Sequence, residues 1–169
     1  MIRPMEAIVA VFSDWGIGSE GTQQVVLKAD RKHFRDLTSG AAVLVGRRTL
    51  GDFPGGKPLK NRYNLVLTRQ DIVIEGAEVV HSEAEAAARA RDFDRCLVIG
   101  GASVYRQMMP FVDTVHITQI RLAPKSDSFF PNLDEDPDWR CIETSPWLEE
   151  DGVPYRFCTY VRSTQKEEP

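Results

Sequence analysis

The chain has 169 residues, which is long enough for one ordinary domain with a buried core. Its hydrophobic fraction of 42% and charged fraction of 27% are ordinary for a soluble globular protein. The formal net charge of -4 gives no reason to expect nucleic acid as a partner, and the longest apolar runs fall short of the roughly 20 residues that span a bilayer.

The cysteines and histidines point away from disulfides and metal ions. Cys96, Cys141 and Cys158 are far apart, odd in number and outside any CxxC pair. The three histidines are equally scattered, so no metal site is expected. The N-terminus "MIRPMEAIVAVF" enters a strand directly and lacks a signal-peptide cleavage pattern, which predicts a cytoplasmic protein.

Strands and helices are expected to alternate along the first half of the chain. The runs at 6–12 and 41–46 are β-branched and apolar, as buried strands are, and 29–38 can form a short helix between them. Residues 47–53 read as a short helix, 61–69 as a third strand and 77–81 as a fourth. Ser82 is the natural N-cap of a helix over 82–90, with Glu85 completing a capping box.

The second half is expected to end in antiparallel strands. Residues 95–101 form a strand and 102–111 a helix, 114–120 alternate as a strand does, and 139–162 predict a hairpin around Asp151 and Gly152. The whole pattern predicts one α/β domain over 1–163, with a mostly parallel sheet and an antiparallel C-terminal edge. Residues 164–169 are a polar tail.

The segment "VIGGASVY" (98–105) is the strongest local motif. A buried strand ends in Gly100 and Gly101 and a helix begins at once, so backbone amides can approach an anion such as a pyrophosphate. The fuller dinucleotide fingerprint GxGxxG is missing, and a tight turn without a ligand is the alternative.

Two further strand ends carry basic residues. In "VGRRTL" (45–50), Arg47 and Arg48 stand at a helix start, where the dipole disfavours cations and an anion nearby is therefore indicated. In "LTR" (67–69), Thr68 and Arg69 end the next strand. Because open α/β sheets bind ligands at the carboxyl ends of their strands, the three strand ends favour a dinucleotide with an extra phosphate.

Four other residues are ambiguous on their own. Asp30 reads as a helix-start acid, Arg62 as a solvated arginine and Thr118 as a sheet residue. Asp127 precedes an aromatic pair and a proline in a loop, which turn chemistry alone can explain.

Taken together, these segments resemble the dihydrofolate reductase family over nearly the whole chain. "AIVAVFSDWGIG" is similar to the family's first strand with its Ile-Gly signature, here Ile17 and Gly18. "VGRRT" is similar to its GR-x-T cofactor motif, "VIGGASVY" to its IGG-x-x-x-Y motif, and "HITQI" with "DSFFP" to its later strand and D-x-x-F-P loop. The order and spacing of these motifs agree.

The resemblance implies an eight-stranded, mostly parallel sheet and the NADPH-dependent reduction of 7,8-dihydrofolate to tetrahydrofolate in one-carbon metabolism. It makes Asp30 the ionisable side chain of the pterin pocket, assisting protonation at N5, and Thr118 its hydrogen-bond partner. Burial of a carboxyl group in an apolar pocket raises its pKa, which favours a retained proton near neutral pH. It also implies antifolate inhibitors as ligands and a monomeric state.

The resemblance assigns the remaining site residues to two sets. Arg62 becomes the clamp on the substrate α-carboxylate, and with it the substrate-binding set is Ile8, Ala10, Leu27, Phe34, Phe53, Leu59, Ile99 and Tyr105. The cofactor-binding set is Ala10, Ile17, Gly18, Gly46, Arg47, Arg48, Thr49, Leu67, Thr68, Arg69, Ile99, Gly100, Gly101, Ala102, Ser103, Val104 and Tyr105. Within it, Arg47, Arg48, Thr68 and Arg69 would meet the 2′-phosphate of NADPH.

The sequence departs from the family pattern at three places. Gln24 and Val25 stand where a Pro-Trp pair is usual, and Leu50 replaces another common tryptophan. The segment 54–61 is longer than usual, which bears on the alignment of Leu59 and Arg62. We therefore expect an unusual affinity for antifolates.

Two other functions stay open. A related pteridine- or pyrimidine-reducing enzyme, such as the reductase of riboflavin synthesis, shares the fold, although Asp30 and the D-x-x-F-P loop favour folate. A non-enzymatic nucleotide-binding protein is disfavoured, because binding NADPH alone would need neither Asp30 nor Arg62.

Overall fold

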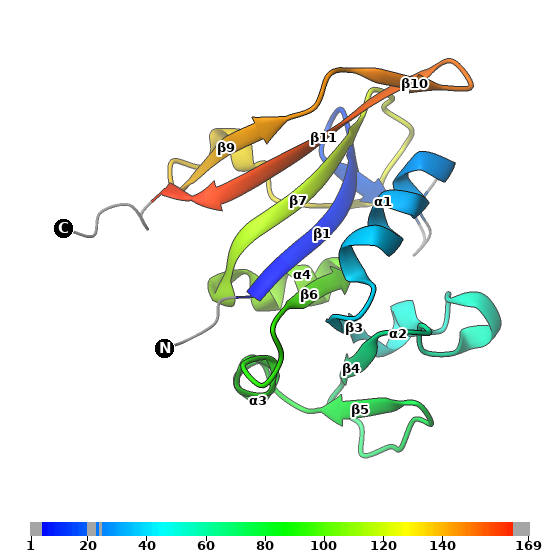
Figure 1. Cartoon of the computed structure of the whole chain (residues 1–169), viewed down its shortest axis with the longest axis vertical. Helices are drawn as coiled ribbons and strands as arrows, with labels where there is room; N and C mark the ends of the chain where they lie inside the picture. The colour runs from blue at the N-terminus through cyan, green and yellow to red at the C-terminus, as the bar shows by residue number, and fades with distance from the viewer. Residues whose placement is uncertain (1–4, 20–22, 24, 164–169) are drawn as a thin grey trace. The chain divides into compact units, whose positions relative to one another are not determined.

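The computed structural model describes residues 5–19, 23 and 25–163, which divide into two units. The first unit comprises residues 5–7 and 34–112, and the second comprises 8–33 and 113–163. Strand β1 (Met5–Phe12) and helix α1 (Lys28–Thr38), which are labelled in Figure 1, each contribute residues to both units.

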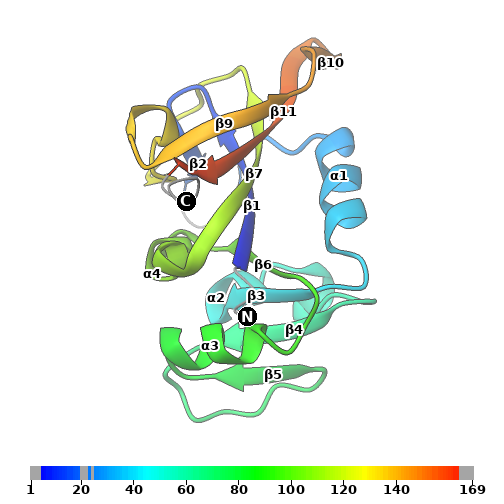
Figure 2. The same cartoon turned by 60° about the vertical axis from the view of Figure 1, so that its left-hand side comes forward.

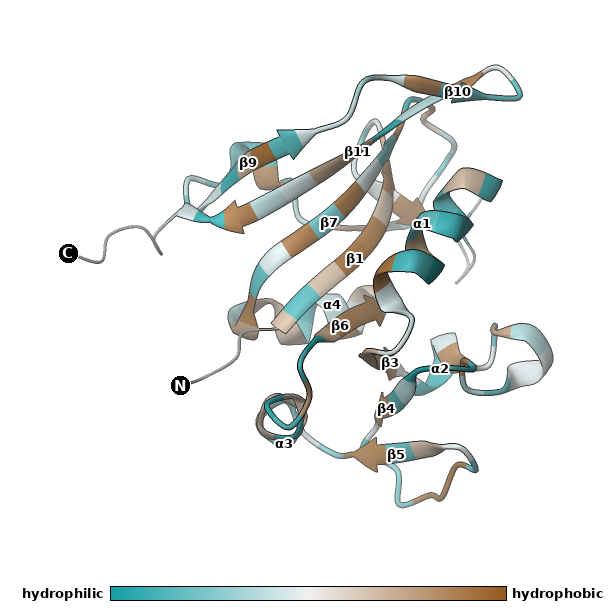
Figure 3. Cartoon of the chain, viewed as in Figure 1, coloured by the Kyte–Doolittle hydropathy of each residue, from teal (hydrophilic) through white to brown (hydrophobic). Residues whose placement is uncertain are grey.

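The first unit is built on parallel strands in the hydrogen-bonded order β1-β6-β3-β4-β5. Every residue of β3 (Ala42–Gly46) is buried, as in parallel strands that helices cover, and Figure 3 shows hydrophobic residues along β3 and β6. Helix α3 contacts β4, as Figure 2 shows. Its other elements are α2 (Arg47–Leu50), η1 (Pro54–Gly56), β4 (Tyr63–Leu67), β5 (Ala77–Val80), α3 (Glu83–Ala90), β6 (Cys96–Gly100), α4 (Ala102–Met108) and η2 (Met109–Phe111).

The second unit is built on antiparallel pairs around β11 (Val153–Arg162), which pairs with β7 (Val112–Ile120), β9 (Trp139–Thr144) and β10 (Leu148–Glu150). Figures 1 and 2 show β9 and β7 running beside β11. A second, two-stranded sheet pairs β2 (Gly16–Gly18) with β8 (Ser128–Phe129), and η3 (Leu133–Glu135) precedes β9.

The predicted fold class is confirmed. The strand order β10-β11-β7-β1-β6-β3-β4-β5 holds eight strands, and β9 also pairs with β11, so nine strands of the described residues belong to this sheet. The neighbouring strands β1, β6, β3, β4 and β5 are parallel, and the C-terminal strands supply the antiparallel edge.

Three local features differ from the sequence-based expectation. Strand β4 begins at Tyr63 rather than at residue 61, because Asn61 has a positive φ of 60° and forms a turn. The short strands β2 and β8 were not expected. Ser82 caps α3 by accepting from the Glu85 N–H at 3.0 Å, but the Glu85 carboxylate accepts from the His81 N–H, one residue before the expected partner.

The described residues hold neither a metal-binding cluster nor a membrane-spanning helix. In this part of the chain no group of His, Cys, Asp or Glu side chains could hold a metal ion, and Cys96 and Cys158 are buried. No helix in the same part is long and apolar enough to cross a bilayer. Gln24 and the tail over 164–169 lie outside the described residues.

Candidate functional site

The carboxyl ends of three parallel strands meet at one edge of the first unit. Gly46 at the end of β3 pairs with Leu67 at the end of β4, and Val45 pairs with Gly100 at the end of β6. The predicted glycine turn and both predicted basic strand ends therefore lie side by side. This is the edge at which open α/β sheets bind nucleotides.

The turn after β6 depends on its two glycines. The Gly100–Gly101 peptide bond is cis, and Gly100 has a φ of 131°, which residues with a side chain rarely adopt. A Cβ at position 101 would lie 2.7 Å from Thr49 Oγ1, so only glycine allows this close approach of α2 to the turn. Gly101 is the N-cap of α4 and supplies no side-chain cap, and Gly46 leaves the start of α2 uncapped in the same way.

Three arginines follow the strand ends at this edge. Arg47, Arg48 and Arg69 are exposed, whereas Thr68 is half-buried. The Thr68 hydroxyl accepts the Gln70 N–H at 3.2 Å, and its carbonyl contacts His81 Nδ1 at 2.9 Å, which fixes the chain at the end of β4. Three guanidinium groups at one edge create a local positive charge on an otherwise acidic protein.

Arg62 lies just before β4 and is held in place by two hydrogen bonds. Its Nε donates to Thr38 Oγ1 at 3.1 Å and its Nη1 to the Lys60 carbonyl at 2.8 Å, while its guanidinium lies over the Phe34 ring at 5.9 Å. Burial and the nearby Arg35 guanidinium lower the pKa of Arg62 from its usual value. The predicted residues Phe34 and Arg62 are thus in contact.

The longer segment before Arg62 is fastened to the sheet by Asn64. This buried amide accepts the Leu59 N–H at 3.0 Å and donates to the Leu59 carbonyl at 2.9 Å and to the Arg62 carbonyl at 3.2 Å. Phe53 and Ile99 pack against the apolar cluster that contains Leu50. Leu50, which stands in place of a tryptophan, is therefore a core residue.

Asp30 is the centre of the second unit's candidate site. It lies in the first turn of α1 and is half-buried, and Thr118 on β7 donates a 2.6 Å hydrogen bond to its Oδ1. Thr118 is 1% exposed, so this hydroxyl is withdrawn from solvent.

The surroundings of Asp30 are apolar. Leu27, just before α1, belongs to a buried cluster with Phe12, Ile120 and Tyr155, and Val25 and Ala10 pack against it. Burial raises the pKa of Asp30, the Thr118 hydrogen bond lowers it, and the Glu150 carboxylate raises it again. Because burial is the largest of these effects, the pKa of Asp30 lies above its ordinary value and the carboxyl group favours a retained proton.

The Ile-Gly segment and the D-x-x-F-P segment form one structure. Gly18 in β2 pairs with Ser128 in β8, and the Asp127 N–H donates to the Gly18 carbonyl at 2.9 Å. A Cβ at Gly16 would overlap Ser126 Oγ. The loop that carries Ile17 is therefore attached to residues 126–130 through their backbone.

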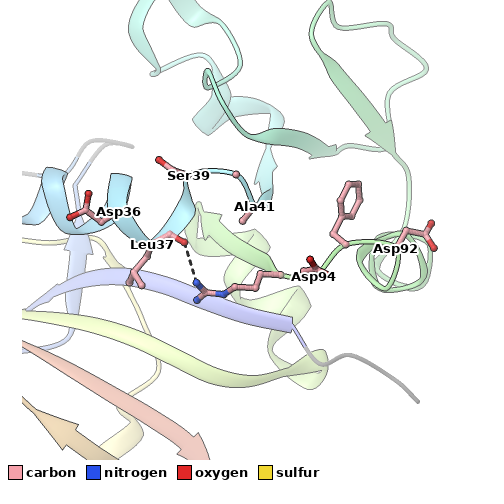
Figure 4. Close-up of a pocket in the computed structure, with 9 residues that line it drawn as sticks. Asp36, Leu37, Ser39, Ala41, Asp92 and Asp94 are labelled. Atoms are coloured by element: carbon pink, nitrogen blue, oxygen red, sulfur yellow. Dashed lines mark hydrogen bonds between the residues drawn. The ribbon is translucent and has the colours of Figure 1, made fainter.

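A separate pocket of about 400 Å³ in the first unit includes none of the predicted site residues. The Arg95 guanidinium there donates to the carbonyl of Leu37 at 3.4 Å, and Arg95 also binds the Glu6 carboxylate at 2.7 Å. Leu37 is labelled among the lining residues in Figure 4. The arginine of this pocket thus has a structural role. The residues that line it are Asp36, Leu37, Ser39, Gly40, Ala41, Asp92, Phe93, Asp94 and Arg95.

Sequence reasoning missed three residues that act on the candidate site. Thr38 holds Arg62, Arg35 adds positive charge beside it, and Glu150 raises the pKa of Asp30. None of them stands in a motif. Their partners lie far along the chain or on a different element, so no local pattern could have indicated them.

A basic, glycine-lined sheet edge suits a dinucleotide, and a carboxyl group whose pKa burial raises suits a reaction that consumes a proton. A chain that combines the two on this fold is, as a class, a dinucleotide-dependent reductase. A family model described as dihydrofolate reductase matches residues 4–162, and the chain belongs to the dihydrofolate reductase family. It is an NADPH-dependent oxidoreductase.

Known relatives cover almost the whole chain. The dihydrofolate reductase of Haemophilus influenzae is 34% identical over 159 residues, which are 94% of this chain and 97% of the relative. That of Mycobacterium tuberculosis is 37% identical over 153 residues, 87% of this chain and 91% of the relative. The solved structure of the Enterococcus faecalis enzyme, complexed with NADP(H) and RAB-propyl, matches with a TM-score of 0.85 and 32% identity, over 95% of this chain and 96% of that one.

Replacing Asp30 by asparagine should stabilise the protein at neutral pH. Because the folded state binds the Asp30 proton more tightly than the unfolded state, the free energy of unfolding falls as pH rises from the unfolded pKa, about 3.9, to the raised folded pKa. The variant Asp30→Asn has no such loss, so its free energy of unfolding should exceed that of the wild type at pH 7 and approach it below about pH 3.9. Urea unfolding at several pH values, with the exposed Asp71→Asn as control, measures this. A lower stability of Asp30→Asn at pH 7 would contradict it.

Proposed function

We propose that Asp30 supplies the acid–base chemistry for the reduction of 7,8-dihydrofolate to 5,6,7,8-tetrahydrofolate. The observation that carries this role is the half-buried Asp30 carboxyl group, bound by Thr118 at 2.6 Å, whose pKa burial raises. A carboxyl group with a raised pKa retains its proton to a higher pH, which favours protonation of the pterin at N5. Thr118 fixes its orientation.

The cofactor-binding set is proposed to hold NADPH, which supplies the hydride that goes to C6 of the substrate. The uncapped helix starts after Gly46 and Gly101 support binding of the pyrophosphate by backbone amides, including those of Ala102, Ser103 and Val104. The exposed Arg47, Arg48 and Arg69, with Thr68, are proposed to bind the 2′-phosphate, since guanidinium groups match phosphate in charge and geometry.

Arg62 is proposed to bind the substrate α-carboxylate. Its two hydrogen bonds to Thr38 and Lys60 restrict its rotamers, so less conformational entropy is lost when the carboxylate binds. The apolar residues proposed to contact the substrate are all buried or half-buried, namely Ile8, Ala10, Leu27, Phe34, Phe53, Leu59, Ile99 and Tyr105.

The substrate can be distinguished from the alternative pyrimidine of riboflavin synthesis by one assay. The family match and the half-buried acid favour dihydrofolate. We expect loss of NADPH absorbance with dihydrofolate and not with the pyrimidine. Activity with the pyrimidine alone would support the alternative reductase, and silence with both would support a non-enzymatic nucleotide-binding protein.

The variant Asp30→Asn should lose most turnover while it still binds NADPH. Removing a general acid reduces kcat by about 100-fold or more. We expect this loss at pH 7, measured by steady-state kinetics, with an unchanged dissociation constant for NADPH in a fluorescence titration. The matched control Asp71→Asn should keep wild-type kcat. A kcat near the wild-type value in Asp30→Asn would remove Asp30 from the mechanism.

Arg62→Lys should weaken substrate binding selectively. A lysine cannot make the paired N–H contacts of a guanidinium, and charge-assisted hydrogen bonds contribute about 1.5–3 kcal/mol each. We expect KM for dihydrofolate to rise roughly 10-fold or more and KM for NADPH to stay unchanged. The exposed Arg91→Lys is the control. If KM for dihydrofolate did not change, Arg62 would have no part in substrate binding.

Four expectations about partners and location stay predictions: a cytoplasmic location, a monomeric state, antifolate inhibitors as ligands and an unusual affinity for them. Val25, in place of the usual tryptophan, packs against the cluster around Leu27, which supports an altered antifolate contact.

A further inference from the structure

Helix α1 begins without a cap of its own. The residue before Lys28 is Leu27, a buried leucine whose side chain has no oxygen to accept a hydrogen bond. The first amide groups of a helix have no partner within the helix and need acceptors from elsewhere. Ser, Thr, Asp or Asn usually supplies one from the N-cap position, and α1 has none of these there.

Glu150 on β10 supplies the missing cap from a distant part of the chain. Its Oε2 accepts the Lys28 N–H at 2.7 Å and its Oε1 accepts the Ala29 N–H at 3.0 Å, so the two carboxylate oxygens each bind one of the first amides. These two hydrogen bonds, together with the positive charge of Lys28, lower the pKa of Glu150. The cap therefore carries a negative charge at the positive end of the helix dipole.

This cap bears directly on Asp30, the third residue of α1. An acid in the first turn of a helix ordinarily turns its carboxylate toward the helix's own amides, which stabilise the ionised form. Here Glu150 occupies the amides of Lys28 and Ala29, and the Asp30 carboxyl group is bound by Thr118 instead. Two carboxyl groups thus lie at the start of α1 with different roles: Glu150 caps the amides, and Asp30 binds Thr118.

We propose that Glu150 is the positioning residue for Asp30, capping α1 so that the Asp30 side chain stays with Thr118 as the acid–base group. This inference rests on the proposed function of Asp30.

The cap occupies the amides that would otherwise stabilise the ionised form of Asp30. The charge of Glu150 also favours the protonated form, because a nearby anion raises the pKa of Asp30. In the described part of the second unit, the groups that act on Asp30 from other elements are Thr118 on β7 and Glu150 on β10. On β11, the Arg156 guanidinium binds Gln119 of β7. Because neighbouring residues of a strand point to opposite faces of the sheet, Gln119 projects from the face opposite to Thr118. On α1 itself the charged or titratable neighbours are Lys28, Arg31, Lys32 and His33.

The test compares Glu150→Gln with Glu149→Gln, which removes the same charge from the adjacent, exposed position of β10. The pKa of Asp30 is followed in the folded protein without ligands by the ¹³C signal of its carboxyl group. In Glu150→Gln we expect that pKa to be lower than in the wild type. Because turnover needs the protonated acid, the decline of kcat with rising pH should start at a lower pH. Glu149→Gln should leave both unchanged.

A second variant, Glu150→Ala, removes the cap as well as the charge. We expect a lower Tm and a lower kcat at pH 7, by up to about 100-fold if the first turn moves by about 1 Å. A cap of purely structural value would lower Tm without moving the Asp30 titration. That outcome, or an equal shift of the titration in Glu149→Gln, would overturn the inference.

Failure of the inference is separable from failure of the proposed function. An inactive Asp30→Asn together with an unshifted Asp30 titration in Glu150→Gln overturns the role of Glu150 alone. Full turnover in Asp30→Asn overturns the catalytic role of Asp30 and with it the positioning role of Glu150, whatever the titration shows.

Discussion

Withdrawal of the Asp30 carboxyl group from water is the constraint on which the arrangement of the second unit depends. A buried polar group is costly unless it is hydrogen-bonded, and Thr118 meets that need with a single short bond. One bond from a neutral hydroxyl is too little to favour full ionisation in apolar surroundings, so burial prevails over hydrogen bonding in setting the acidity. The same surroundings that would destabilise a structural carboxylate favour the proton delivery that we propose for Asp30.

The first unit carries the sheet edge at which we propose that NADPH binds. Its parallel strands end at one edge, so that a glycine turn after β6 and basic residues after β3 and β4 become neighbours through the pairing of the strands. Glycine at 101 allows Thr49 to approach the turn, which brings the starts of α2 and α4 together. The proposed cofactor surface therefore follows from strand direction and from two residues that lack side chains, more than from specific ion pairs.

Sequence patterns located the elements whose signals are local. The apolar runs of β1, β3 and β6 were readable because strands covered on both faces need no polar alternation, and Ser82 marked the start of α3 by its own capping chemistry. Strands β2 and β8 have three and two residues, too few to show a period. Asp30 was ambiguous as a single residue and became interpretable only through the family resemblance. No sequence pattern indicates Thr38 or Glu150, because the residues that they bind lie on other elements, 24 and more than 120 positions away.

The distance in sequence between Asp30 and its partners has a consequence for synthesis of the chain. Thr118 follows it by 88 residues, and the carboxylate at the end of β10 binds the helix start across 121 and 122 residues. While the ribosome is still making the intervening strands, this acid is an ordinary hydrated aspartate. It acquires its altered acidity only after the C-terminal hairpin has emerged and folded back, so a nascent polypeptide that has already formed its first helix has yet to become an enzyme.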